Sequence, residues 1–209
     1  QILLAQPDPS SYEGYRDMVL LSVLYDTGAR VQELVDIKVK DVRLTAPAVV
    51  TLHGKGSKMR TAPIIGRTAN LMKTYLEKKK YHVGIAKSDN YLFVNQKQQQ
   101  LSRWGISYIL DKYVEMAKSD PEFQIRFPVT PHVLRHSKSM HLLQSGVNLI
   151  YIRDFLGHVD CSTTEVYARA DSEMKRKAIE NAYVDLVPDE IPRWEEDGEL
   201  MRWLSDFCK

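Results

Sequence analysis

The chain has 209 residues, 44% of them hydrophobic, which is enough for one sizeable packed core. It contains no run of about 18 apolar residues, so the sequence predicts no membrane span, and its first residues lack the pattern of a secretory leader. Two cysteines, Cys161 and Cys208, argue against a disulfide framework and favour a reducing, cytoplasmic location.

Charge is distributed unevenly along the chain. The net charge is +2, but residues 184–209 hold eight acidic and three basic side chains, so this tail carries −5 and residues 1–183 carry +7. A basic body suits a polyanionic partner, and an acidic tail indicates a separate role for that segment. We therefore expect two parts, a body at 1–183 and an acidic tail at 184–209.

The first predicted helix ends at a glycine. The chain begins at Gln1 and not at methionine, which suggests a piece of a longer protein. Ser10 and Glu13 have capping-box spacing, and Gly28 is expected to end the helix that follows. Arg30 comes next and is expected to point from the start of a second, short helix.

A hairpin is predicted after these helices. Residues 49–52 and 59–64 are predicted as two strands, joined by the turn 53–58. Lys55 lies between two glycines at the tip of this turn, where a solvated lysine is the ordinary interpretation. A helix is expected over 68–80.

The middle of the chain leaves one element open. Residues 90–95 contain the apolar run YLFV, which is either a strand or a buried loop. Residues 101–117 are predicted to form a helix, with five apolar side chains as candidate core. These are Trp104, Ile106, Ile109, Leu110 and Val114.

Three short helices are predicted between Thr130 and Arg169. Thr130 is a candidate N-cap followed by Pro131 at the first helical position, and Gly146 lies just past the end. Asn148 is expected to cap a second helix that Gly157 stops. A third begins where Ser162 and Glu165 have capping-box spacing; these ends all rest on local signals.

The end of the chain is predicted to be helical on both sides of a linker. A helix from residue 171 or 172 to 183 is followed by a linker bracketed by Pro188 and Pro192. The tail then places apolar side chains at i, i+3, i+4 and i+7: Leu200, Trp203, Leu204 and Phe207. Such a stripe needs a groove, either on its own body or on a neighbouring subunit, and the sequence favours neither.

Four polar side chains of the 130–169 stretch suggest a site that holds a phosphate. His132 and Arg135 lie three apart on one helix, and His158 follows the helix-ending glycine. Tyr167 comes nine residues after His158. Each of these residues alone is more commonly structural, but together they combine cationic donors with a phenol nucleophile.

The motifs that carry these residues resemble those of the tyrosine recombinase (phage integrase) family. HVLRH supplies His132 and Arg135, LGH supplies His158, and STTEVYAR supplies Tyr167. TGARVQEL resembles the family's first arginine motif, with the catalytic arginine at Arg30 and the supporting acid at Glu33. HGKGSKMRTAPI resembles the hairpin that bears the catalytic lysine, here Lys55. The resemblance covers roughly residues 10–183; Lys138 is a minor departure from the pattern.

This resemblance implies a fold and an activity. The fold would be α+β, mainly helical with a small antiparallel β-sheet or hairpin. The activity would be site-specific cleavage and rejoining of DNA strands through a 3′-phosphotyrosine intermediate, without metal, ATP or another cofactor, in DNA integration or recombination, and the sequence leaves open whether it serves a mobile element or the chromosome. The partners would be double-stranded DNA and three further copies in a homotetramer. An N-terminal DNA-binding domain would be missing, so the isolated piece would bind DNA weakly as a monomer.

The residue chemistry fits that activity. Arg30 and Arg135 can clamp the non-bridging oxygens of a phosphate, and removing one such donor typically costs ~2.7–4 kcal/mol of barrier. His158 can add a hydrogen bond, and Tyr167 is the nucleophile. His132 can act as base or proton relay, and Lys55 as the general acid for the departing 5′ oxygen. No acidic cluster of two-metal type stands out among these motifs.

Two other functions remain open at this point. A type IB topoisomerase shares the chemistry, and would relax supercoiled DNA without a specific site. A catalytically silent DNA-binding regulator of a mobile element would bind DNA in a salt-sensitive way and form no covalent adduct. The six filled catalytic positions disfavour the regulator.

Overall fold

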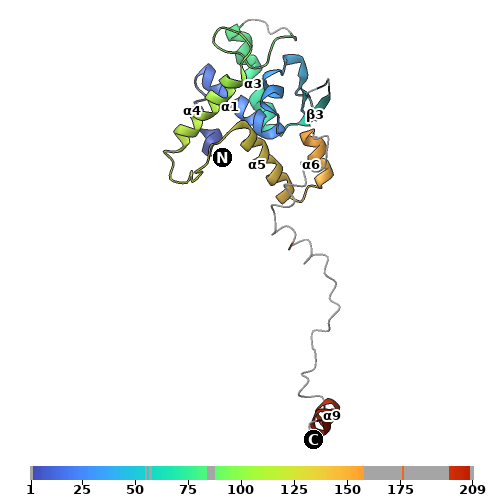
Figure 1. The fold of residues 1–209 in the computed structure, drawn as a ribbon. Helices are drawn as coiled ribbons and strands as arrows, with labels where there is room; N and C mark the ends of the chain where they lie inside the picture. The colour runs from blue at the N-terminus through green and yellow to red at the C-terminus, as the bar shows by residue number, and fades with distance from the viewer. Residues whose placement is uncertain are drawn as a thin grey trace. The chain divides into compact units, whose positions relative to one another are not determined.

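The computed structural model describes residues 2–54, 56, 58–83, 88–157, 176 and 198–207. The chain separates into two compact units, Gln1–Ala170 and Asp171–Lys209. The boundary at 183/184 drawn from charge stays a prediction. The elements of the first unit (Figure 1) are η1 (Ile2–Ala5), α1 (Tyr12–Thr27), α2 (Val31–Val35), η2 (Val39–Asp41), β1 (Val42–Arg43), β2 (Val49–His53), β3 (Met59–Pro63), α3 (Gly66–Val83), α4 (Arg103–Ala117), α5 (Pro131–Gln144) and α6 (Leu149–Leu156). The predicted class, α+β and mainly helical with a small antiparallel sheet, is confirmed.

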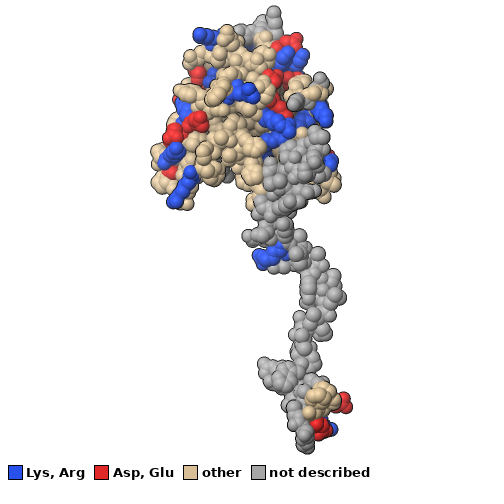
Figure 2. Space-filling model, viewed as in Figure 1, with Lys and Arg blue, Asp and Glu red and all other residues tan. Residues whose placement is uncertain are grey.

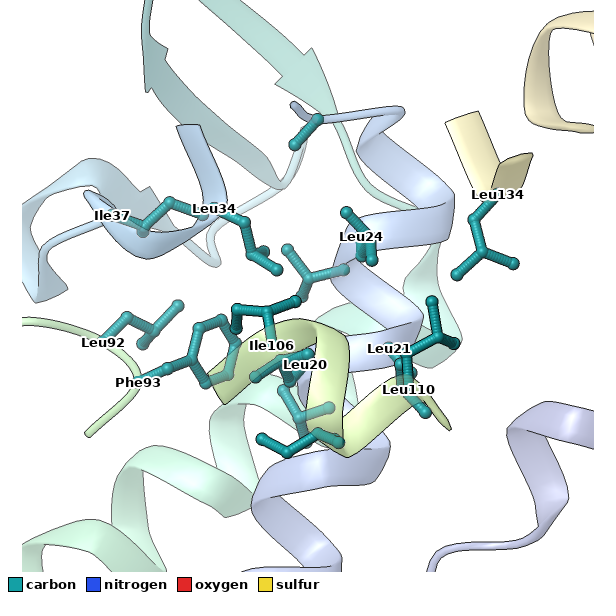
Figure 3. Close-up of a cluster of buried hydrophobic side chains, with 14 of the residues drawn as sticks. Leu20, Leu21, Leu24, Leu34, Ile37, Leu92, Phe93, Ile106, Leu110 and Leu134 are labelled. Atoms are coloured by element: carbon teal, nitrogen blue, oxygen red, sulfur yellow. The ribbon is translucent and has the colours of Figure 1, made fainter. Parts of the chain in front are cut away.

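Helix α1 is the centre of the first unit. It packs against α3 and α5, and its buried leucines face side chains from α4 and from the segments after α2 and α3 (Figure 3). The N-cap is Ser11, whose hydroxyl accepts a hydrogen bond from the Gly14 amide at 3.0 Å. The predicted cap at Ser10 was wrong by one residue, because the Ser10 hydroxyl donates to Asp8 instead.

The sheet is antiparallel in the order β1-β2-β3. Strands β2 and β3 pair from Val49↔Pro63 to His53↔Met59, which confirms the predicted hairpin. Strand β1 was not predicted, and its two residues pair with Val49 and Val50. Helix α6 lies next to β3 (Figure 1), so the sheet adjoins one of the helices predicted between Thr130 and Arg169.

Residues 90–95 form a buried loop and not a strand. Leu92, Phe93 and Val94 are buried, and the pairing in this region is limited to isolated bridges. The Tyr75 hydroxyl and the Lys79 ammonium, both on α3, donate to the Leu92 carbonyl at 3.0 and 2.7 Å. The loop therefore satisfies its backbone through side chains of α3.

Helix α4 corrects one predicted core residue. Ile106, Ile109, Leu110 and Val114 are buried as expected, but Trp104 is 85% exposed. Two helical steps separate Trp104 from Ile106, about 200° around the axis, so it lies on the opposite face.

The predicted ends of α5 and α6 are confirmed. Thr130 caps α5, and Gly146 follows the helix with a positive φ of 80°. Asn148 caps α6, and Gly157 ends it in the left-handed region at φ 66°. The predicted third helix, with Ser162 and Glu165, lies outside the described residues, as does the helix predicted to end at residue 183 apart from the helical Arg176.

The second unit contains α9 (Gly198–Phe207), within the tail predicted to be helical. The rings of Trp203 and Phe207 stack at 5.2 Å between centroids, as the i, i+4 spacing allows. No helix in the described part of the chain is both long and apolar enough to cross a membrane.

Candidate active site

Arg135 is buried and joins the ends of two helices. The Thr130 hydroxyl accepts a hydrogen bond from the Val133 amide and so fixes where α5 begins. With that start, Arg135 falls on the buried face of the helix. The side chain donates from Nη1 to the Gly28 carbonyl and from Nη2 to the Leu156 carbonyl, the latter at 2.7 Å. One guanidinium therefore connects the turn after α1 to the last residue of α6.

Arg30 reaches the same region from the start of α2. Its Nη1 is 2.7 Å from Glu33 Oε1, and its Nη2 lies 3.4 Å from the Gly157 carbonyl. The side chain is 48% exposed, so an incoming anion can reach it. Because Arg135 binds the carbonyl of Leu156 and Arg30 that of the next residue, the two arginines approach each other at the end of α6.

Glu33 is the buried carboxylate of this cluster. It accepts from the Arg30 backbone amide at 2.9 Å, from the Arg30 side chain and from Arg60. Burial raises the pKa of Glu33, but the positive charge of Arg60 and the hydrogen bonds from Arg30 outweigh it, and the net pKa is lowered. Glu33 is therefore held as an anion between two guanidinium groups.

Arg60 belongs to the same cluster, although the sequence reasoning did not single it out. It lies on β3, and its Nη2 is 2.9 Å from Glu33 Oε2. A signal was available, since residues 60, 62 and 64 share one face of a period-2 strand and the other two are apolar and buried. A charged residue on the same strand face as buried apolar residues indicates a buried partner.

Three predicted site residues lie outside the described residues: Lys55, His158 and Tyr167. The residues before two of them are described, and both lie at the cluster. Gly54 is close to Glu33, since a Cβ built on it would lie 3.7 Å from Glu33 Oε1. The carbonyl of Gly157 accepts the bond from Arg30. The roles proposed for all three remain predictions.

Two histidines of α5, His132 and His141, lie in different surroundings. His132 lies in the first turn and is exposed, whereas Arg135, three residues on, is buried. His141 lies near the end of α5, where its Nδ1 forms a hydrogen bond with the Tyr25 hydroxyl. His132 can therefore be reached from solvent, while His141 links α5 to α1.

The arrangement suits an anion and shows no metal site in the described ranges. The guanidinium groups of Arg30 and Arg60 pair with the single carboxylate of Glu33, and Arg135 binds the carbonyls of Gly28 and Leu156 beside them. Among the residues that the structure describes, no three His, Cys, Asp or Glu side chains gather closely enough to hold a metal ion. On the face seen in Figure 2, Lys and Arg are interspersed with Asp and Glu, so no continuous basic surface covers it.

Comparison with known proteins identifies the family of this fold and site. The profile of the "Phage integrase family" matches residues 1–174. The tyrosine recombinase XerD of Staphylococcus epidermidis is 37% identical over 175 residues, which covers 84% of this chain and 57% of that relative. The chain thus spans little more than half the length of the curated relatives it matches.

Two solved structures show the same fold. XerA recombinase aligns with a TM-score of 0.71 at 24% identity, covering 88% of this chain and 62% of that one. A second structure is XerH site-specific recombinase bound to palindromic difH substrate, a post-cleavage complex. It aligns with a TM-score of 0.70 at 24% identity, covering 93% of this chain and 50% of that one. Because the family match also runs from residue 1 to residue 174, the chain belongs to the phage integrase family of tyrosine recombinases.

Proposed function

We propose that this chain cleaves and rejoins DNA strands at specific sites through a 3′-phosphotyrosine intermediate. The observation that carries the proposal is the approach of Arg30 and Arg135 at the carbonyls of Leu156 and Gly157. One guanidinium is buried and fixed, and the other is half exposed beside it. Such a pair suits a phosphodiester, whose non-bridging oxygens gain negative charge when phosphorus is attacked.

In the proposed reaction, Tyr167 Oη attacks phosphorus and the bond from phosphorus to the 5′ oxygen breaks. The phenol proton passes to a base, for which His132 is the candidate, and the departing 5′ oxygen takes a proton from Lys55. His158 donates to the non-bridging oxygens. The products are a 3′-phosphotyrosine and a 5′ hydroxyl, and attack by another 5′ hydroxyl reverses the step without metal or ATP.

Two relatives support DNA as a partner. XerH is bound to its difH substrate in the solved complex, and the Tn1549 transposon integrase to transposon right end DNA. We propose double-stranded DNA as the substrate of this chain, bound in a homotetramer, with the isolated chain a monomer in dilute solution. The net charge of +7 on residues 1–183 supports binding to a polyanion.

Trapping the covalent intermediate tests the proposal. Duplexes that bind the chain would be recovered from a randomised pool, nicked near the binding site so that the released 5′ fragment diffuses away, and incubated with the protein. We expect an adduct that survives denaturing electrophoresis and that mass spectrometry assigns to Tyr167. Tyr167→Phe should abolish the adduct and leave duplex affinity within about twofold, because the phenol contributes to chemistry more than to binding.

A matched control uses another tyrosine. Tyr151 on α6 is 69% exposed, so Tyr151→Phe should leave the adduct unchanged. An adduct that persists in Tyr167→Phe would overturn the assignment. Relaxation of supercoiled plasmid with no preferred sequence would identify a topoisomerase, and salt-sensitive binding with no adduct on any recovered duplex would identify a silent regulator.

A further inference from the structure

Arg60, on the hairpin strand β3, forms hydrogen bonds with several groups of the candidate site. Its side chain is 12% exposed and donates to groups from three other segments. Nη1 donates to the carbonyls of Thr27, at 3.2 Å, and Phe155; Nη2 lies 3.4 Å from the Gly28 carbonyl and 2.9 Å from Glu33 Oε2. Arg60 therefore connects β3 to the turn after α1, to α2 and to the end of α6.

The side chains of Arg60 and Arg30 bind different carboxylate oxygens of Glu33. Arg60 binds Oε2, which also accepts the backbone amide of Arg30, and the Arg30 side chain binds Oε1. Arginine and carboxylate groups commonly pair through two parallel hydrogen bonds. Since Arg60 occupies one oxygen, the side chain of Arg30 makes a single bond to Glu33 and keeps its 48% exposure.

The charges of Glu33 and Arg60 also favour an exposed Arg30. With Arg60 present, the negative charge of Glu33 is balanced by a buried cation, and the positive charge of Arg30 is directed at solvent. Without Arg60, the buried Glu33 would have Arg30 as its remaining guanidinium partner among the described residues. Arg30 would then be drawn into a two-bond pair with Glu33, and an incoming phosphate would have to compete with that carboxylate.

The geometry points to Arg60 as a positioning residue of the DNA-cleavage site, which keeps Arg30 available to phosphate by occupying one oxygen of Glu33. This inference rests on the proposed function and adds a residue to it. In this role Arg60 touches neither DNA nor the reacting atoms, and it acts on Arg30 through Glu33.

A purely structural role makes a different prediction. Arg60 also binds the Phe155 carbonyl, so it could serve only to fasten α6 to the sheet. In that case the loss of Arg60 would be equally harmful with or without the carboxylate of Glu33. If Arg60 acts through Glu33, its loss should matter only while that carboxylate is present.

A double-mutant cycle separates the two roles. Arg60→Met, Glu33→Gln and the double variant would be made in the full chain, and the rate of adduct formation measured per folded molecule, with duplex affinity from fluorescence anisotropy. We expect Arg60→Met to slow adduct formation about tenfold or more, because one oxyanion donor is typically worth about 10²–10³ in rate and here it is misplaced and not deleted. In the Glu33→Gln background the same change should alter the rate less than about threefold.

Two further variants keep the test decisive. Arg43 is an exposed arginine on β1, so Arg43→Met controls for the loss of one positive charge from the sheet and should cleave within about twofold of wild type. If Arg60→Met does not fold, Arg60→Lys separates the two roles, because lysine keeps a positive charge beside Glu33 but cannot reach several carbonyls at once. The inference then expects a rate near that of wild type, and a purely fastening role expects a loss. Equal losses from the Arg60 change in both Glu33 backgrounds, or a wild-type rate in Arg60→Met, would overturn the inference.

Failure of the proposed function gives a different pattern. If wild type forms no adduct with any recovered duplex, cleavage is rejected, and the inference is judged on binding alone. Arg60→Met should then weaken duplex affinity severalfold in the wild-type background and leave it unchanged in an Arg30→Ala background. If wild type forms the adduct and Arg60→Met forms it equally fast, only the inference about Arg60 fails.

Discussion

Arg16 and Arg60 are both buried arginines paired with a buried carboxylate, and their networks end differently. Arg16, on α1, donates from Nε and Nη2 to Asp17 Oδ1 at 2.9 and 2.7 Å, and from Nη1 to the Val94 carbonyl. The second oxygen of Asp17 accepts from the Tyr113 hydroxyl at 3.0 Å. The Arg16 and Asp17 side chains are 9% and 4% exposed and Tyr113 is 2% exposed, so this network is closed inside the core.

The network of Arg60 is open at one end. Its carboxylate, Glu33, binds a second guanidinium, Arg30, that is half exposed. A closed network of this kind stabilises the folded structure, because its charged groups pair with one another inside the core. An open network of the same chemistry holds a charged group at the surface in one place, which is what a phosphate site requires.

Removing the arginine of the closed network should produce the largest loss of stability. Arg16→Met leaves the buried Asp17 with one hydroxyl donor from Tyr113, and breaking a buried ion pair in this way typically costs about 3–5 kcal/mol. Denaturant unfolding would measure the loss, and adduct formation per folded molecule should equal that of wild type. The double variant Arg16→Met/Asp17→Asn should recover much of the stability, because no unpaired charge remains. A specific loss of cleavage in folded Arg16→Met would show that the closed network also serves the site.

Lys79 extends the comparison, because it is a buried cation that pairs with no carboxylate among the described residues. It is 1% exposed and donates to the carbonyls of Tyr91 and Leu92. Burial lowers the pKa of Lys79 to about 8 from its ordinary value of 10.5. The unfolded chain therefore binds more protons between those values, and this group makes the folded state more stable as pH rises from about 8 to 10.5.

The expected pH effect is measured as a difference between two proteins. The free energy of unfolding of wild type minus that of Lys79→Met should increase by up to about 3 kcal/mol over this pH window and stay flat below it. Taking the difference removes the contribution of tyrosines that titrate at high pH and do not share a partner with Lys79. A difference that does not change between pH 8 and 10.5 would mean that Lys79 keeps its ordinary pKa when buried.

The parts of the fold that the sequence predicted well depend on local signals. The ends of α5 and α6 were correct because Thr130, Asn148 and Gly157 act on the backbone within a few residues of themselves. Ser10 and Ser11 are adjacent and equally good caps, so the choice between them depended on Asp8, which binds Ser10. Local rules gave the helix but not its first residue.

The parts that were missed depend on contacts between distant segments. Strand β1 has two residues and exists because β2 pairs with it. Arg60 binds a carboxylate 27 residues away and the Phe155 carbonyl 95 residues away, and neither separation appears as a spacing in the sequence. The approach of Arg30 to Arg135 was expected from family resemblance, and its physical basis, two successive carbonyls at the end of α6, is visible only in the fold.

Substitutions at two glycines test how rigidly the Arg60 side chain is held in the open network. Gly146 and Gly157 both follow helices with a positive φ, 80° and 66°, so alanine at either position should cost about 1–2 kcal/mol of backbone strain. They differ in their surroundings: a Cβ at Gly146 would meet no atom of the described residues within 4 Å, whereas one at Gly157 would lie 2.8 Å from Cδ of Arg60. Gly157→Ala should therefore cost more than Gly146→Ala.

The size of that difference measures the rigidity of Arg60. Its far end is held by Glu33 and by the carbonyls of three residues, so the side chain cannot turn aside without losing hydrogen bonds. Overpacking of this kind typically costs about 1–3 kcal/mol, which is the expected gap between the two alanine variants in denaturant unfolding. If Gly146→Ala and Gly157→Ala unfold at the same denaturant concentration, Arg60 moves easily, and it cannot be what holds Arg30 in place.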